Sequence, residues 1–235
     1  LVRGLSVSSG TTVNVTKNKI YNLSETGAIS TTTSAVNGFL FSGGTTVTAS
    51  NNLIGDLRAP AASLTDAIRG ISITSTTAST TFNIFHNTVN INATSTGTNF
   101  GTTALFHTFS TTATSAALNL RNNILVNNSA PNGTGLTVAF RRSAATNLNN
   151  YATTSNNNLF WAGNTGLTCT NRVIYSDGTS NLQLVAFKAL VTPRETASVQ
   201  EDPSFLSTSG ATANFLHINP AIQTQIESGA AFIAT

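Results

Sequence analysis

The segment TFNIFHNTVNI, residues 81–91, contains the two patterns that decide the fold of this chain. Apolar and polar residues alternate through Phe82, Asn83 and Ile84, and an Asn-x-hydrophobic marker follows at Asn87 and Val89. The marker returns at spacings of 33, 36, 35 and 35 residues, as Asn18-x-Ile20, Asn51-x-Leu53, Asn87-x-Val89, Asn122-x-Ile124 and Asn157-x-Leu159. A repeat of this length predicts a solenoid, a propeller or an array.

A second, mostly glycine-led marker keeps step with the first, as Gly4-Leu5, Gly38-Phe39, Gly70-Ile71, Ala104-Leu105 and Gly135-Leu136. In each repeat, this marker, the alternating segment and the segment after the asparagine are typical of three short strands. No two-residue Asn-Gly loop joins these strands, so the chain turns corners and advances, which pairs each strand in parallel with its counterpart one repeat later. We therefore predict an all-β parallel β-helix of about six to seven coils.

The regular coils extend over residues 1–161, and residues 162–235 are expected to be irregular, cap-like coils of the same domain. Residues 182–190 carry apolar side chains at helical spacing before Pro193, which predicts one short helix. In the repeats, surplus residues fall between the third strand and the next first strand, at 24–35, 56–67, 93–103 and 128–134. Insertions at one repeat position lie on one flank of a solenoid.

Composition excludes several classes of function. Charged residues form 8% of the chain, and Arg141-Arg142 is the only basic doublet, so nucleic-acid binding has no support. No segment has the roughly 20 apolar residues of a membrane span, so no membrane insertion is expected. The single cysteine, Cys169, excludes an intramolecular disulfide.

The recurring asparagines are expected to stack. Asparagine tolerates a left-handed corner, and equivalent corners of successive coils lie roughly 4.8 Å apart, so side-chain amides can bond along the axis. The predicted ladder consists of Asn18, Asn51, Asn87, Asn122 and Asn157. The doublets Asn51-Asn52 and Asn122-Asn123 leave open which member faces inward.

The C-terminal motifs carry a resemblance. Coils with Asn corners, then Phe187-Lys188-Ala189, Asp202-Pro203-Ser204-Phe205 and Leu216 to Ile222, resemble the end of secreted right-handed parallel β-helix proteins. These belong to the pectate-lyase-like superfamily and are common in Bacteroidota. The resemblance implies a right-handed solenoid at the cell surface or outside the cell, and for its enzymes the cleavage of acidic polysaccharides.

The carboxylates do not match that catalytic pattern. None of the acidic residues lies on a glycine-led strand, whereas glycoside hydrolysis needs two carboxylates facing one site. We predict no catalytic residue and no required cofactor. Asp56 and Asp66 share one insert and are candidates to hold Ca²⁺, but the favoured interpretation is that they are solvated loop and turn-capping groups.

The glycan-binding candidates are Arg3, Arg69, Arg141, Arg142 and Trp161. Arg3 and Arg69 occupy the same repeat position, so they predict an arginine row that suits an anionic glycan. The alternative is that these arginines solubilise the surface. Trp161, with Tyr151 and Phe160, forms either a sugar-stacking platform or aromatic core filling.

These observations favour a non-enzymatic extracellular β-helix, a surface stalk, adhesin or filament component, with a polysaccharide-binding or lyase-like module as the alternative. The segment from Leu1 to Val7 already matches the internal repeat without a cap. A bare solenoid edge is expected to be covered, either by other coils of a longer polypeptide or by head-to-tail copies of this chain. The absence of Met at position 1 favours the first arrangement.

Overall fold

The computed structural model describes residues 1–31, 33–163, 171–226, 229–230 and 233. Cys169 lies outside them. The described chain forms a parallel β-solenoid of about five turns with one short helix, which confirms the predicted fold class but not the estimate of six to seven coils. None of the helices among the described residues is long and apolar enough to cross a membrane.

Three main sheets run along the solenoid. The first contains β1 (Val2–Val7), β5 (Val36–Phe41), β9 (Leu64–Ile73), β12 (Phe100–His107), β15 (Thr137–Arg142) and β17 (Arg172–Ser176), all parallel, with β18 (Asn181–Leu182) antiparallel at its end. The second contains β2 (Thr12–Thr16), β6 (Thr46–Ser50), β10 (Thr81–Phe85) and β13 (Ala117–Arg121).

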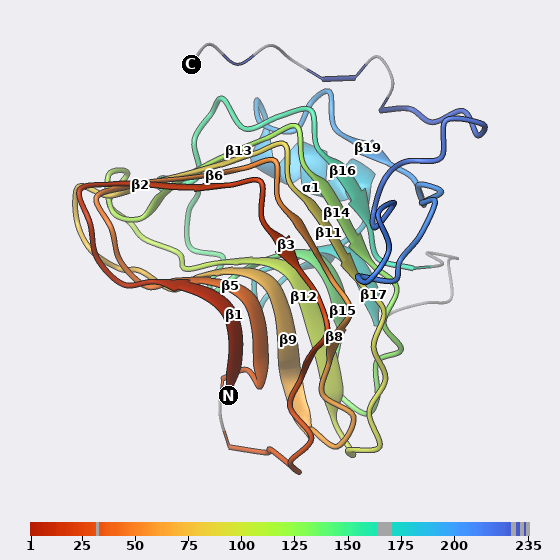
Figure 1. The fold of residues 1–235 in the computed structure, drawn as a ribbon. Helices are drawn as coiled ribbons and strands as arrows, with labels where there is room; N and C mark the ends of the chain where they lie inside the picture. The colour runs from red at the N-terminus through yellow and green to blue at the C-terminus, as the bar shows by residue number, and fades with distance from the viewer. Residues whose placement is uncertain (32, 164–170, 227–228, 231–232, 234–235) are drawn as a thin grey trace.

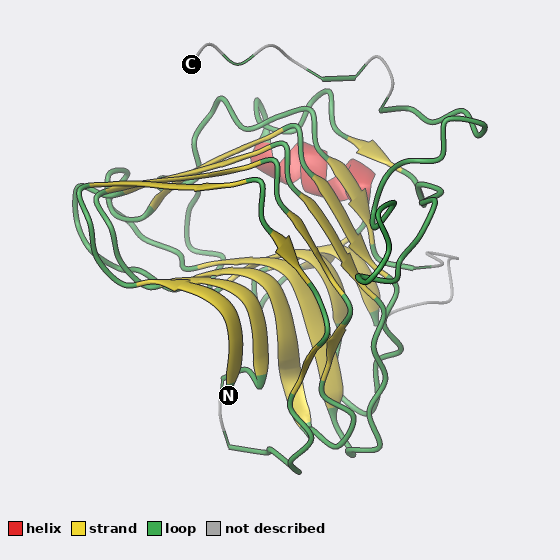
Figure 2. Ribbon diagram, in the orientation of Figure 1, coloured by secondary structure: helices red, strands yellow, loops and turns green. Residues whose placement is uncertain are grey.

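The third sheet contains β3 (Lys19–Ile20), β7 (Leu53–Gly55), β11 (Thr88–Ile91), β14 (Ile124–Asn127), β16 (Leu159–Trp161) and β19 (Val199–Gln200). A short pair, β4 (Leu23–Ser24) and β8 (Leu57–Arg58), continues it towards the inserts. Figure 1 looks down the axis with the first coil in front, and Figure 2 shows that the strands of the first sheet bend strongly midway.

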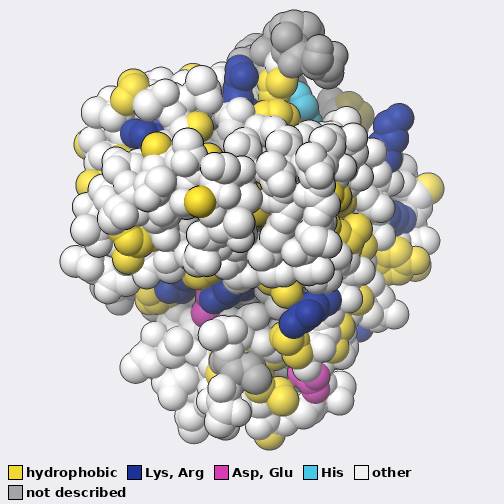
Figure 3. All heavy atoms as spheres, turned by 90° about the vertical axis from the view of Figure 1, so that its left-hand side faces the viewer, with side chains coloured by type: hydrophobic (Ala, Val, Ile, Leu, Met, Phe, Trp, Pro, Cys, Tyr) yellow, Lys and Arg dark blue, Asp and Glu magenta, His cyan; other side chains and the backbone are white. Residues whose placement is uncertain are grey.

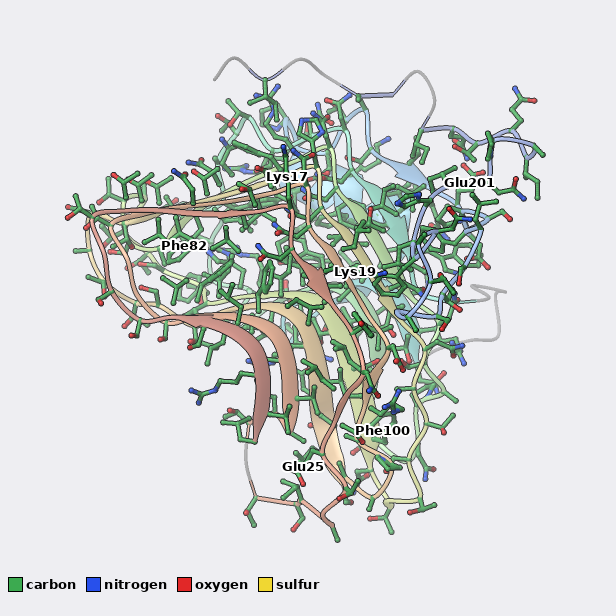
Figure 4. All side chains as sticks on the ribbon, in the orientation of Figure 1. Lys17, Lys19, Glu25, Phe82, Phe100 and Glu201 are labelled. Carbon is green, nitrogen blue, oxygen red and sulfur yellow. The ribbon has the colours of Figure 1, made fainter. Side chains whose placement is uncertain are left out.

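The alternating strands of the second sheet point their apolar residues into the interior, as predicted. Phe82, Ile84, Leu118 and Leu120 are fully buried, and Figure 4 shows Phe82 between the first and second sheets. In the first coil, Val15 is buried and Val13 is partly buried. The period-2 alternation therefore identified the core side of these strands.

Truncating Leu120 to alanine is expected to lower the free energy of unfolding by about 3 kcal/mol, because it leaves a cavity in a packed interior. Val185→Ala is the control, since Val185 is 85% exposed on the helix. Urea denaturation of both variants measures the difference. A loss for Leu120→Ala as small as that for Val185→Ala would show that the interior is not tightly packed.

The predicted register of the fifth glycine-led marker is wrong. Leu105 pairs with Phe140 rather than with Leu136, and Thr103 pairs with Val138 rather than with a residue at 134. Gly135 lies instead in the insert, where a Cβ atom would come within 1.9 Å of the Phe100 carbonyl oxygen. This glycine is needed for close backbone approach, so the residue type alone misled the alignment.

The inserts stack on one flank, as predicted. The Ser63 backbone N–H donates to the Ile29 carbonyl at 2.8 Å, and the Thr96 backbone N–H donates to the Pro60 carbonyl at 2.9 Å. The Asn132 side chain donates to the Gly97 carbonyl at 2.7 Å. These bonds join successive inserts into the lobe that carries Glu25 at the bottom of Figure 4.

The predicted helix is α1 (Leu184–Val191), which begins two residues later than expected and closes the C-terminal end of the interior. Its buried Phe187 packs against Phe140, Phe160 and Tyr175. The following irregular segment then returns along the third sheet towards the first coil. Lys19 donates from Nζ to the Thr212 carbonyl at 2.5 Å, and Figure 4 shows Lys19 beside this segment.

Candidate functional site

A groove lies on the outer surface of the first sheet, where its strands bend beside the insert lobe. It has a volume of about 470 Å³. In-register parallel pairing places residues of one repeat position in rows across the strands, roughly 4.8 Å apart. Two such rows line the groove or continue beyond it. The first row contains Arg3, Asn37, Arg69 and Thr103. The second row contains Leu40, Ser72, Phe106 and Arg141.

Figure 3 faces this side of the molecule. Most of the visible surface is neither charged nor hydrophobic, whereas basic side chains and an acidic one gather in the hollow between the upper part and the insert lobe.

Asp66 at the start of β9 organises the polar side chains of the two rows. Its Oδ2 accepts from Arg69 Nε at 2.8 Å, and its Oδ1 accepts from Thr103 Oγ1 at 2.5 Å. Arg141 Nε donates to Thr103 Oγ1 at 3.0 Å and lies 3.8 Å from Asp66 Oδ1. One carboxylate thus positions two guanidinium groups and a hydroxyl.

The Arg69 guanidinium also lies over an aromatic ring. Its central carbon is 3.6 Å from the centre of the Phe106 ring, and its Nη1 donates to Ser72 Oγ at 3.3 Å. Cation–π contact, the ion pair and this bond leave little side-chain freedom. The groove therefore holds a preorganised cation that a ligand does not need to order.

The charges in this region do not balance. Arg3, Arg69 and Arg141 contribute three positive charges against the single negative charge of Asp66. Arg141 Nη2 is buried and has no acceptor among the described residues. The Arg141 side chain keeps 16% of its surface exposed, and a guanidinium group favours an anionic partner with planar oxygens, such as a carboxylate or a sulfate.

Two of the predicted glycan-binding residues lie elsewhere. Arg142 faces the interior because its neighbour Arg141 faces outward, and it donates to the Asn147 carbonyl at 2.7 Å and to Asn150 Oδ1 at 2.6 Å. Trp161 belongs to the third sheet, where Nε1 donates to Asn128 Oδ1 at 2.8 Å. The fold brings together Arg3 and Arg69 in one row and Arg141 in the neighbouring row.

The prediction of a sugar-stacking platform is wrong for Tyr151 and Phe160, because both rings are fully buried. Both belong to the aromatic filling of the last coils.

The two candidate calcium ligands face different partners. Asp56 pairs with Arg58, whereas Asp66 pairs with Arg69 in the groove. Among the described residues, no group of three or more His, Cys, Asp or Glu side chains is arranged to hold a metal ion. The two carboxylates thus serve separate ion pairs.

The asparagine ladder is present, with three of its five predicted members shifted by one residue. Each side-chain amide donates to the Oδ1 of the next ladder residue at 2.8–3.0 Å. The members are Asn18, Asn52, Asn87, Asn123 and Asn158.

The prediction that Asn51, Asn122 and Asn157 belong to the ladder is therefore wrong. They occupy the corner with φ of 57°, 57° and 59°, a left-handed conformation that asparagine adopts readily. The corner turns the chain, and the side chain of the next residue then points inward. Asn18 and Asn87 follow corners formed by Lys17 and His86, with φ of 57° and 54°.

Buried Glu195 ends the ladder. Asn158 Nδ2 donates to its Oε2 at 2.9 Å and to its Oε1 at 3.1 Å, and the Tyr151 and Ser198 hydroxyls also donate to this carboxylate. Burial raises the pKa of Glu195 above its usual value, although these hydrogen bonds oppose the shift. Sequence reasoning missed this residue because its partners lie up to 44 positions away.

Sequence reasoning placed Thr103 in the row of Arg3 and Arg69 but missed Phe106 as a contributor to the groove. The repeat register does align Thr103 with Arg69, but the stacking of Arg69 on Phe106 depends on side-chain packing.

Comparison of this chain with family models, curated proteins and solved structures finds no match.

Proposed function

We propose that this chain is a non-enzymatic extracellular β-solenoid of the bacterial cell surface, structural or adhesive in role, that binds an acidic polysaccharide along the groove. A relation to the pectate-lyase-like superfamily is part of this proposal. The observation that carries it is the Asp66-centred cluster, in which Arg69 is preorganised and the Arg141 side chain remains 16% exposed.

The direction of the rows supports a polymeric ligand. Both rows cross the strands, so a chain that follows them runs parallel to the solenoid axis and meets Arg3, Asn37 and Arg69 in succession. Guanidinium groups bind carboxylate or sulfate with two parallel bonds. An uncharged polymer would leave the excess positive charge without a partner.

The groove favours binding without hydrolysis. Glycoside hydrolysis by general acid and base needs two carboxylates on opposite sides of the bond. Among the described residues, Asp66 is the carboxylate that joins the groove cluster, and both of its oxygens accept hydrogen bonds.

Arg141→Gln is expected to weaken binding of polygalacturonate or chondroitin sulfate about 10–100-fold, since charge-assisted bonds contribute roughly 1.5–3 kcal/mol. Arg58→Gln is the matched control, because Arg58 pairs with Asp56 away from the groove cluster. Calorimetric titration at low and high salt, with neutral dextran as a further control, measures the effect. Equal losses in the two variants would place binding outside the groove.

Catalysis is tested separately by incubating the protein with pectin, alginate and chondroitin sulfate and following unsaturated products. Turnover that Asp66→Asn abolishes would replace the binding role by a lyase-like one.

A further inference from the structure

One segment of the chain departs from the neighbour-to-neighbour contacts of the solenoid. The ladder bonds join residues 34–36 positions apart, so each coil is bonded to the next one. Residues 201–219, which follow β19 and are called the strap below, instead run along the outer side of the third sheet, in blue to the right of β3 in Figure 1. Lys19 on β3 donates from Nζ to the Thr212 carbonyl of the strap at 2.5 Å, across 193 positions of sequence.

The strap is a closed loop with hydrogen bonds of its own. The Leu216 backbone N–H donates to the Ser207 carbonyl at 2.7 Å, and the Asn219 backbone N–H donates to the Ser204 carbonyl at 2.8 Å. These bonds tie the two ends of the strap to each other rather than to the sheet. The strap can therefore dock on the sheet, or leave it, as one unit.

Phe215 and Leu216 of the strap build a second apolar layer on the outside of the third sheet. They are at most 2% exposed, yet neither belongs to the interior core. They lie over Gly55 of β7, where a Cβ atom would come within 3.0 Å of the Phe215 ring. Gly55, Asn90 and Val126 form one row across the strands, and the residue before each of them belongs to the interior core, so all three face outward. All three are nonetheless buried.

The strap touches the first coil through few side chains. The Tyr21 and Phe215 ring centres are 6.0 Å apart, and Lys19 Nζ lies 5.4 Å from the first and 5.3 Å from the second. Gly210 of the strap packs directly against Tyr21, where a Cβ atom would overlap the ring. A segment held by so few buried apolar contacts opens before the packed interior does.

We propose that the strap is a conformational latch on the third sheet. Docked, it reaches from Asn128 beside β14, which donates to Asp202 at 3.5 Å, to Lys19 on β3, and it couples these distant coils into one cooperative unit. Undocked, it leaves β3 and β7 with contacts to their neighbouring coils alone, so these strands open locally while β14 and β16 stay folded. The stability of a solenoid is close to a sum of repeat and neighbour terms, so a link across several coils supplies cooperativity that the repeat does not.

Gly210→Val tests the latch, because the added side chain overlaps the Tyr21 ring and prevents docking while every interior residue stays the same. Thr208→Val is the matched control, an isosteric change at an exposed position of the strap. Hydrogen exchange of the intact chain is expected to show amide protection in β3 and β7 at least about 10-fold lower in Gly210→Val, with less than about a twofold change in β14 and β16. The control is expected to match the native chain.

Three outcomes overturn the latch. An equal loss of protection in all strands would make the strap part of the global fold, and unchanged protection in β3 and β7 would mean that it couples nothing. A loss in Thr208→Val as large as that in Gly210→Val would remove the connection with docking.

Tyr21→Ala separates a docking clash from damage within the strap. Without the ring, the space beside Gly210 is open, so adding Gly210→Val is expected to lower the protection of β3 and β7 by less than about twofold beyond Tyr21→Ala alone. A further loss as large as that in the native background contradicts the proposal, because the valine would then act inside the strap.

Discussion

Replacing Asn87 with alanine is expected to lower the free energy of unfolding by about 3–5 kcal/mol. Asn87 Oδ1 accepts two bonds from Asn52, and its Nδ2 donates to Asn123, Ala49 and Phe85. The variant leaves these buried groups without a partner, and each unsatisfied buried polar group costs about 1–3 kcal/mol. The side chain sits in the middle of the ladder, where water does not replace it.

Asn83→Ala is the matched control, because Asn83 lies on the outward face of the neighbouring strand and makes two bonds of 3.4 Å. Its expected loss is below about 1 kcal/mol. Urea denaturation of the two variants gives the comparison. If both lose the same free energy, the ladder does not stabilise the solenoid beyond ordinary surface contacts.

Acidification is expected to destabilise the fold through His107, which lies on the interior side of β12. Burial and the nearby Arg142 guanidinium lower the pKa of His107 to about 3, and its Nε2 lies 2.8 Å from the Ala116 carbonyl. The unfolded chain takes up this proton near the ordinary histidine pKa of 6.5, whereas in the folded chain the pKa is about 3. The stabilisation that comes from neutral His107 is therefore complete above pH 6.5 and is lost as the pH falls from 6.5 towards 3.

Linkage gives the size of the effect. At about 1.4 kcal/mol for each pKa unit, protonation in the unfolded state alone costs about 3 kcal/mol of stability between neutral pH and about pH 4. Glu195 opposes it. Because burial raises the pKa of Glu195, its contribution to stability falls as the pH rises through the raised value. The net curve is accordingly flatter than the His107 contribution.

His107→Gln isolates the histidine, since glutamine can still donate to the Ala116 carbonyl but does not titrate. Urea denaturation of both proteins from about pH 7 to about pH 4 is the measurement. The native chain is expected to lose about 3 kcal/mol more than the variant. Parallel curves would mean that His107 is accessible to protons in the folded state.

The sequence determined the periodic part of this protein. Interactions between neighbouring coils repeat every 32–36 residues, so the same side-chain requirement recurs and is visible as a marker. Period-2 alternation identified the buried side of β10 and β13, and the helical spacing of residues 182–190 identified α1. The arginine row was predictable for the same reason, since Arg3 and Arg69 share a repeat position.

Only the tertiary structure decided the features that depend on one residue of register or on contacts between unlike segments. Asn51 and Asn52 are chemically identical, so the left-handed corner alone determines which of them faces inward. Arg141 and Arg142 are adjacent and identical, yet the pleat directs one to the groove and buries the other.

The contacts of Asp66 and Glu195 are also decided by the tertiary structure and not by the repeat. Nothing in the sequence around Asp66 indicates that its carboxylate connects Arg69 with Thr103 one coil later, because that contact requires both the insert and the bend of the first sheet. Glu195 lies outside the repeat and meets Asn158 and Tyr151 only where the irregular C-terminal segment folds over the last coil. A repeated pattern encodes contacts between like coils, whereas contacts made once leave no periodic signal, so the ends of the solenoid and its groove emerged from packing.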